Sequence, residues 1–130
     1  MPTKYADIIM YLDAIANNPN LNGDMGSSPH HYWWHVNQDD TQPPLAYNDF
    51  ITGTVSGVGV PIINTANPSQ SMFYLLLSTP GGTGGFNQMP WHGPYITDSD
   101  FSVQLSNGNT ISGADIQANI ASWLGNGYPQ

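Results

Sequence analysis

The sequence His31-Tyr32-Trp33-Trp34-His35 is the most informative stretch of the chain, because it brings three aromatic rings and two histidines together within five positions. It is followed some fifty residues later by Met89-Pro90, and near the end of the chain by residues 116–124, which read IQANIASWL. The chain contains no cysteine, so neither a disulfide nor a thioether bond can form anywhere in it. The candidate site residues are therefore histidines, a methionine and aromatic side chains.

The length and composition predict one folded domain over residues 1–130. Hydrophobic residues make up 39% of the chain, which includes seven tyrosines, four phenylalanines and four tryptophans. Burial of so many aromatic side chains can offset the conformational entropy that ordering costs. The sequence is therefore not that of a disordered segment.

The charge is strongly one-sided, since Lys4 is the only cationic side chain besides the histidines and all nine acidic residues are aspartates, for a formal net charge of -8. A phosphate backbone would be repelled by this surface, and no arginine is present to hold a base, so nucleic-acid binding is excluded as a function. No apolar run approaches the roughly 20 residues of a membrane span, so we expect no membrane insertion.

Hydrophobic periodicity and end signals predict four helices. The first begins after a possible Thr3 cap, the third begins with the pair Asn67-Pro68, and the last begins with the motif Ser112-x-x-Asp115. The predicted helices are residues 4–17, a short one around 46–52, 68–78 and 113–124. Phe101, Val103 and Leu105 alternate before the turn signal Asn107-Gly108, which predicts a β-hairpin over residues 101–111.

The expected fold is mainly helical with long loops. Helices 4–17 and 113–124 each carry an apolar stripe that needs a partner, and we expect them to cross near four apolar side chains. These are Ile8, Leu12, Ile120 and Trp123. The alternative is a β-rich binding module built from residues 55–63 and 101–111.

Several of these segments, in this order, resemble a class I c-type cytochrome domain over nearly the whole chain. The matching pieces are Tyr5 to Leu12, His31 to His35, Asn67 to Ser71 with the following helix, Met89-Pro90, and Ile120 through Trp123 to Gly127. The resemblance implies a cytochrome-c-like arrangement of orthogonal helices in which the N-terminal helix crosses the C-terminal helix. The hairpin 101–111 then looks like an insertion.

The chain departs from that family at the residues that attach the haem. Its two attachment cysteines align with His31 and Trp34, so covalent haem is excluded. Its two axial ligands align with His35 and Met89, and the resemblance makes these two the candidate cofactor-binding residues. One interpretation is a retained site for a transition metal formed by His31, His35, Met89 and His92, and copper is the metal that imidazole and thioether ligands favour. A non-covalently bound haem is a second interpretation.

The alternative interpretation is a cofactor-free core. A tryptophan at position 34 would project its ring into the haem crevice, and Tyr32, Trp33 and Trp91 could complete the plug. The same aromatic residues, if exposed, would suit sugar rings, so carbohydrate is one candidate partner. The pairs Asp39-Asp40 and Asp98-x-Asp100 lack the loop of a calcium motif and are expected to be solvated turn residues.

No enzymatic signature is present. The chain has no cysteine nucleophile, no glutamate and no G-x-S-x-G motif, and the glycine-rich run 81–85 lacks the lysine of a phosphate loop. We therefore expect a non-catalytic module, without catalytic residues, that serves in electron transfer, metal binding or partner binding. Its expected partner is a larger parent protein, a redox partner or carbohydrate. The resemblance and the composition together lead us to expect a periplasmic or extracellular location.

Overall fold

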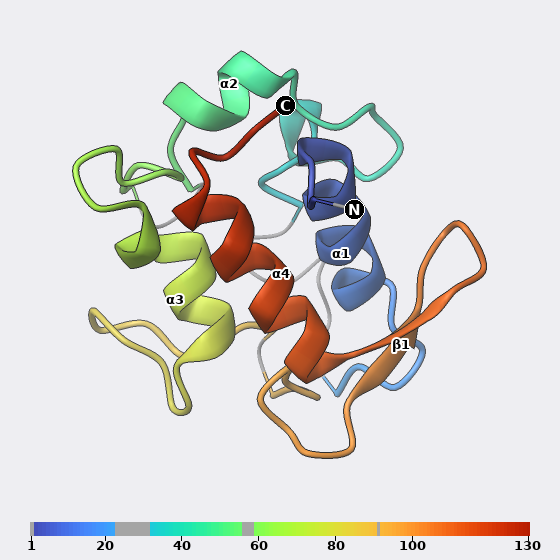
Figure 1. Cartoon of the computed structure of the whole chain (residues 1–130). Helices are drawn as coiled ribbons and strands as arrows, with labels where there is room; N and C mark the ends of the chain where they lie inside the picture. Colours follow the sequence, from blue (N-terminus) through green and yellow to red (C-terminus); the bar gives the residue numbers. More distant parts are fainter. Residues whose placement is uncertain (1, 23–31, 56–58, 91) are drawn as a thin grey trace.

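The computed structural model describes residues 2–22, 32–55, 59–90 and 92–130, and its main elements are helices (Figure 1). Within these residues the chain forms four α-helices, two short 3-10 helices and one two-stranded antiparallel hairpin near the C-terminus. Their bounds are α1 Tyr5–Ala16, η2 Val36–Gln38, α2 Tyr47–Thr52, η3 Pro68–Gln70, α3 Met72–Ser78, β1 Ser102–Gln104, β2 Thr110–Ser112 and α4 Gly113–Gly125. The prediction of a mainly helical domain is confirmed, and the β-rich alternative is wrong.

The first helix begins one residue later than predicted, and its cap differs. Lys4, not Thr3, is the residue before the first helical turn. The backbone N–H of Lys4 donates to the Asp7 carboxylate at 2.9 Å. An acid in the first turn also favours the positive end of the helix dipole, so Asp7 fixes this start.

The predicted helix 68–78 is interrupted at Ser71, which separates η3 from α3. Ser71 is fully buried, and its hydroxyl donates to the Pro68 carbonyl at 2.7 Å while accepting from the Asn64 N–H at 2.9 Å. A serine side chain that bonds the local backbone competes with the helical hydrogen bonds. Its ψ of 130° is accordingly extended rather than helical.

The hairpin and α4 form as predicted. Val103 pairs with Ile111 across the two strands, and the alternating residues Phe101, Val103 and Leu105 are all buried. Ser112 then caps α4, since its hydroxyl accepts from the Asp115 N–H at 3.2 Å. The last helix therefore begins at the residue that follows the hairpin.

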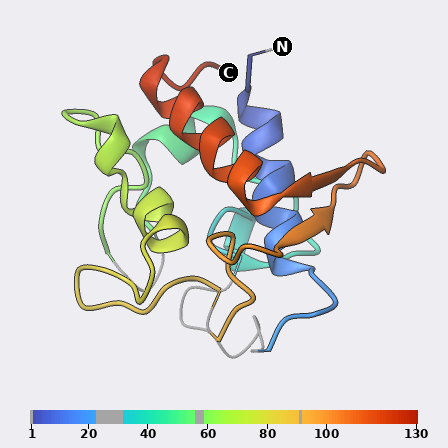
Figure 2. The same cartoon turned by 60° about the horizontal axis from the view of Figure 1, so that its bottom comes forward.

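One hydrophobic core joins the N-terminal and C-terminal helices. The four side chains expected at their crossing, Ile8, Leu12, Ile120 and Trp123, are between 0% and 3% exposed. The amide of Asn119 on α4 donates to the Tyr11 hydroxyl on α1 at 3.0 Å, and the two helices lie beside each other in both views (Figures 1 and 2). This core holds α1 in place for the contacts described next.

Candidate functional site

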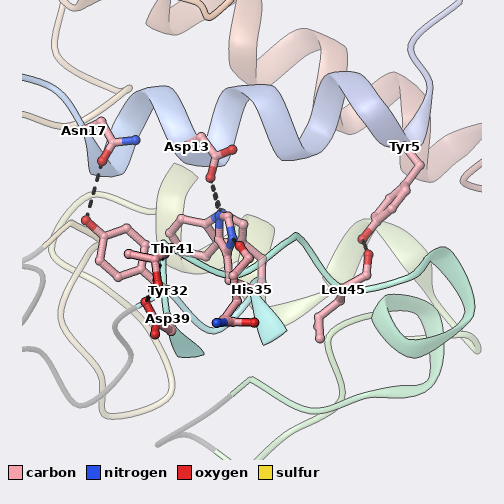
Figure 3. Close-up of polar contacts among 10 residues, drawn as sticks. Tyr5, Asp13, Asn17, Tyr32, His35, Asp39, Thr41 and Leu45 are labelled. Atoms are coloured by element: carbon pink, nitrogen blue, oxygen red, sulfur yellow. Dashed lines mark hydrogen bonds and ion pairs between the residues drawn. The ribbon is translucent and has the colours of Figure 1, made fainter. Parts of the chain in front are cut away.

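Helix α1 lies along the segment of residues 32–45, which we call the aromatic segment, and contacts it at both ends (Figure 3). Near the start of the helix the Tyr5 hydroxyl donates to the Leu45 carbonyl. At the other end the Tyr32 hydroxyl lies 3.5 Å from the Asn17 side-chain oxygen. Between these two contacts, the Asp13 side chain points at Trp34 and His35.

The Asp13 carboxylate binds both Trp34 and His35 through one oxygen. Its Oδ1 accepts from the Trp34 indole N–H at 2.7 Å and lies 2.7 Å from Nε2 of His35. The His35 side chain is 8% exposed and that of Asp13 is 34% exposed. A carboxyl oxygen has lone pairs for two partners, so Oδ1 can serve both side chains.

The other ring nitrogen of His35 faces its own loop. Nδ1 lies 2.7 Å from the Gln42 carbonyl oxygen. The loop folds back because the Leu45 N–H donates to the Trp34 carbonyl, and it turns through Asn37 and Gln38, which both have a φ of 56°. His35 is therefore held from two sides, by α1 and by the return of the aromatic segment.

Met89 lies in an apolar crevice. Its backbone N–H donates to the Leu76 carbonyl at 2.8 Å, which fixes it near the end of α3, and its side chain packs against the core. The crevice is lined by apolar side chains from α1, the aromatic segment and α3, and by Val55 and Met89-Pro90. About 30 Å³ of space remains among them. That is roughly the volume of one water molecule and far below the ~300–1,000 Å³ of ligand pockets.

The predicted site residues are thus placed in different surroundings. Trp33, Trp34 and Met89 line the crevice, whereas the His35 ring is bonded to Asp13 and Gln42. His92 is exposed with a φ of 65°, and its carbonyl accepts from the Asn22 amide. His31 lies outside the described residues, as does Trp91. Among the residues that are described, no three His, Asp, Glu or Cys side chains form a group able to hold a metal ion.

As placed, these residues do not fit the cofactor that the resemblance implies. A haem needs a slot far larger than the 30 Å³ left beside Met89. A metal on His35 needs the lone pair of one ring nitrogen, and both nitrogens face oxygen atoms at 2.7 Å. The shared site of His35 with Met89, His31 and His92 stays a prediction.

A second concavity, of about 600 Å³, lies between the end of α2 and the start of α3. Its floor and rim carry Ile51, Ile63, Met72, Asn64 and Gln70. None of the described residues that line it is ionisable, and none is a predicted site residue. It is a neutral groove separate from the crevice.

Asp39 behaves as a turn acid, as expected. The pKa of its carboxyl is lowered, first because it accepts from the Thr41 N–H at 2.9 Å and then because it accepts from the Thr41 hydroxyl at 2.7 Å. The nearby His35 lowers it further through its charge. The hydrogen bonds of the Asp39 carboxylate are thus made within its own loop.

Asp13 is the site residue that the sequence analysis missed. It stands beside the apolar stripe of helix 4–17, where a half-exposed aspartate is ordinarily a solvated surface residue. No spacing rule connects it with a histidine 22 positions later. The one signal in the sequence was the shortage of cationic side chains. With a single lysine and no arginine, an acid at the edge of the core has few possible partners other than the histidines.

In comparisons with known proteins, no family model, no curated protein and no solved structure matches the chain. In the part of the chain that the structure describes, no helix is long and apolar enough to cross a membrane.

Proposed function

We propose that this chain is a non-catalytic, cytochrome-c-like module without a cofactor, in which the chain's own side chains occupy the place of the haem. In this proposal α1 and α4 are the crossed terminal helices of that fold, and the hairpin β1–β2 is an insertion before α4. The module then serves as a structural or binding domain for a protein partner or a larger parent protein. Its periplasmic or extracellular location is part of the same proposal.

The observation that carries this proposal is the position of Trp34. In the resemblance to that family this residue aligns with the second attachment cysteine. Trp34 is 3% exposed and lines the crevice together with Met89. It packs edge-on against Trp33, with ring centroids 5.4 Å apart and planes at 80°, and its N–H is bonded to Asp13. A buried tryptophan usually finds a hydrogen-bond partner for its N–H, so the packing and the bond to Asp13 together support Trp34 as a core residue.

The burial of Trp33 bears on the choice of partner. Its ring is 7% exposed and contacts Phe50 and Phe73 at 5.7 and 5.9 Å between centroids. A sugar needs an open aromatic face, and Trp33 does not supply one. Electron transfer through a His35 and Met89 copper site is the competing function, and the titration below separates the two.

The test is a calorimetric titration of the chelator-treated protein with Cu²⁺, and separately with haemin followed by absorbance. We expect no saturable heat from Cu²⁺ and no Soret shift from haemin, because the crevice is full and His35 is engaged. The matched variants are His35→Ala and Met89→Leu. One-to-one binding in the wild type that weakens at least tenfold in both variants would overturn the proposal in favour of a shared metal site.

A further inference from the structure

Helix α4 ends at the pair Asn126-Gly127, where the backbone forms a specific helix stop. The N–H of Tyr128 donates to the Trp123 carbonyl at 2.8 Å, and the N–H of Gly127 donates to the Leu124 carbonyl at 3.4 Å. Gly127 has a φ of 83°, which a glycine adopts without strain. This bond pattern is a Schellman motif, and the ring contact of Tyr128 with Trp123, at 6.1 Å between centroids, is its usual hydrophobic companion.

Asparagine is a chemically labile residue, and a following glycine increases its lability because no side chain blocks the reaction. The backbone nitrogen of the glycine gives its proton to water and attacks the asparagine Cγ. A C–N bond forms, the Cγ–Nδ2 bond breaks, and the amide nitrogen leaves as ammonia with a proton from water. Water then opens the succinimide ring at either carbonyl carbon, which yields aspartate or isoaspartate. The reaction needs only water, and hydrogen bonds that hold the glycine N–H or the asparagine side chain slow it.

The chain contains three Asn-Gly pairs, and the structure describes two of them completely. In the turn of the hairpin, the Gly108 N–H donates to the Leu105 carbonyl at 2.9 Å. The side-chain oxygen of Asn107 accepts from the Asn109 N–H at 3.0 Å. Both reacting groups of this pair are therefore held by hydrogen bonds of ordinary length. The pair that begins at Asn22 extends beyond the described residues.

The contacts of Asn126-Gly127 are longer. The Gly127 N–H bond of 3.4 Å exceeds the roughly 2.7–3.2 Å of ordinary N–H···O bonds. Nδ2 of Asn126, the group that leaves, donates to the Ser122 hydroxyl at 3.2 Å, and both residues of the pair are exposed to water. At its ψ of 18° the backbone of Asn126 must rotate before the glycine nitrogen faces Cγ, and the long bond opposes that rotation weakly. We propose that Asn126 is a site of spontaneous modification, which converts to aspartate or isoaspartate through a succinimide with Gly127, in preference to Asn107.

The modification falls at a turn that holds the following segment on the core. The Tyr128 carbonyl accepts from the Tyr47 hydroxyl of α2, and the Pro129 carbonyl accepts from the Trp123 indole N–H at 2.7 Å. Isoaspartate directs the main chain through Cβ and so lengthens it by one atom inside the Schellman motif. Either product adds a negative charge at the C-terminal end of α4, where the helix dipole disfavours an anion. Conversion of Asn126 should therefore loosen this segment.

This inference does not rest on the proposed function. The full chain is incubated at mildly alkaline pH, once folded and once in urea, and the conversion of each pair is followed by peptide mapping and mass spectrometry. In the folded protein we expect Asn126 to convert about fivefold faster than Asn107, which corresponds to the roughly 1 kcal/mol of one hydrogen bond. In urea the two should convert at similar rates. The matched control Asn126→Gln keeps an amide that cannot close the same ring, so it should abolish conversion at this position alone.

The alternative outcomes contradict the proposal. Conversion at Asn126 that is absent, or no faster than at Asn107, in the folded protein overturns it. The same preference in urea also overturns it, because the local sequence and not the fold is then the cause. The converted protein, separated by ion exchange, should melt at a lower temperature than the unconverted protein, whereas Asn126→Gln incubated for the same time should keep its melting temperature. An unchanged melting temperature after full conversion would show that the modification leaves the end of α4 intact.

Discussion

The apolar and the polar contacts of α1 are held by different physics. Ile8 and Leu12 join the apolar core that contains Ile120 and Trp123 of α4. Tyr5 and Asp13 on the helix, and Asn17 at its C-terminal end, reach polar atoms of the aromatic segment (Figure 3). Apolar stabilisation scales with the area removed from water, whereas the polar contacts depend on a few directed bonds. Substitutions in the two sets of contacts should therefore differ in size and in pH dependence.

The largest effect is expected in the apolar core at Trp123. Its ring is 1% exposed, contacts Phe50 and Tyr128, and donates to the Pro129 carbonyl at 2.7 Å. Trp123→Ala should lower the free energy of unfolding by about 3–5 kcal/mol, measured by urea denaturation. The exposed control Asn48→Ala should change it by less than about 0.5 kcal/mol. Equal losses in the two variants would show that the core does not dominate stability.

A smaller loss is expected where α4 meets the loop before the hairpin. A Cβ on Gly113 would lie 2.1 Å from the Ile96 carbonyl oxygen, and that backbone atom cannot move aside cheaply. Gly113→Ala should therefore cost about 1–3 kcal/mol in the same assay. Gly125, at the other end of α4, has open space around it, so Gly125→Ala should cost nothing. A neutral Gly113→Ala would mean that α4 does not approach Ile96 this closely.

Among the polar contacts, Trp34→Phe should keep an aromatic ring in the crevice while removing the N–H that bonds Asp13. We expect a loss of about 1 kcal/mol, the usual net contribution of one hydrogen bond, because Asp13 retains His35 and water as partners. Trp34→Ala, which also empties the crevice, should cost more than Trp34→Phe by the transfer and cavity energy of the lost ring. The difference between the two variants measures packing against hydrogen bonding at this position, and no difference would contradict the filled crevice.

The smallest effect is a pH dependence at Tyr5. Burial, and then the charge of Asp49, raise the pKa of Tyr5 from its ordinary value of 10.0 to about 12. The folded state therefore disfavours tyrosinate, so this stability is complete below pH 10 and is lost as the pH rises through about 12. Tyr5→Phe should show a shallower decline of unfolding free energy between these values. An identical decline in both proteins would remove Tyr5 as the cause.

The sequence predicted the apolar contacts of α1 better than its polar contacts. Hydrophobic periodicity correctly predicted α1, α4 and the burial of Ile8, Leu12, Ile120 and Trp123. It could do so because the buried face of a helix follows from the spacing of apolar residues within that helix. It did not predict the break at Ser71, where one hydroxyl bonds two backbone groups. The partner of His35 was also missed, since contacts between residues distant in sequence depend on tertiary placement.

The most direct test of the central claim is the melting temperature of the chelator-treated protein with and without excess haemin or Cu²⁺. A module whose crevice is filled by Trp33, Trp34 and Met89 should melt cooperatively as purified, at a temperature that neither addition changes. A ligand at one hundred times its Kd would add about 2.7 kcal/mol of stability. A rise in melting temperature of several degrees with either ligand, abolished in His35→Ala, would contradict the account.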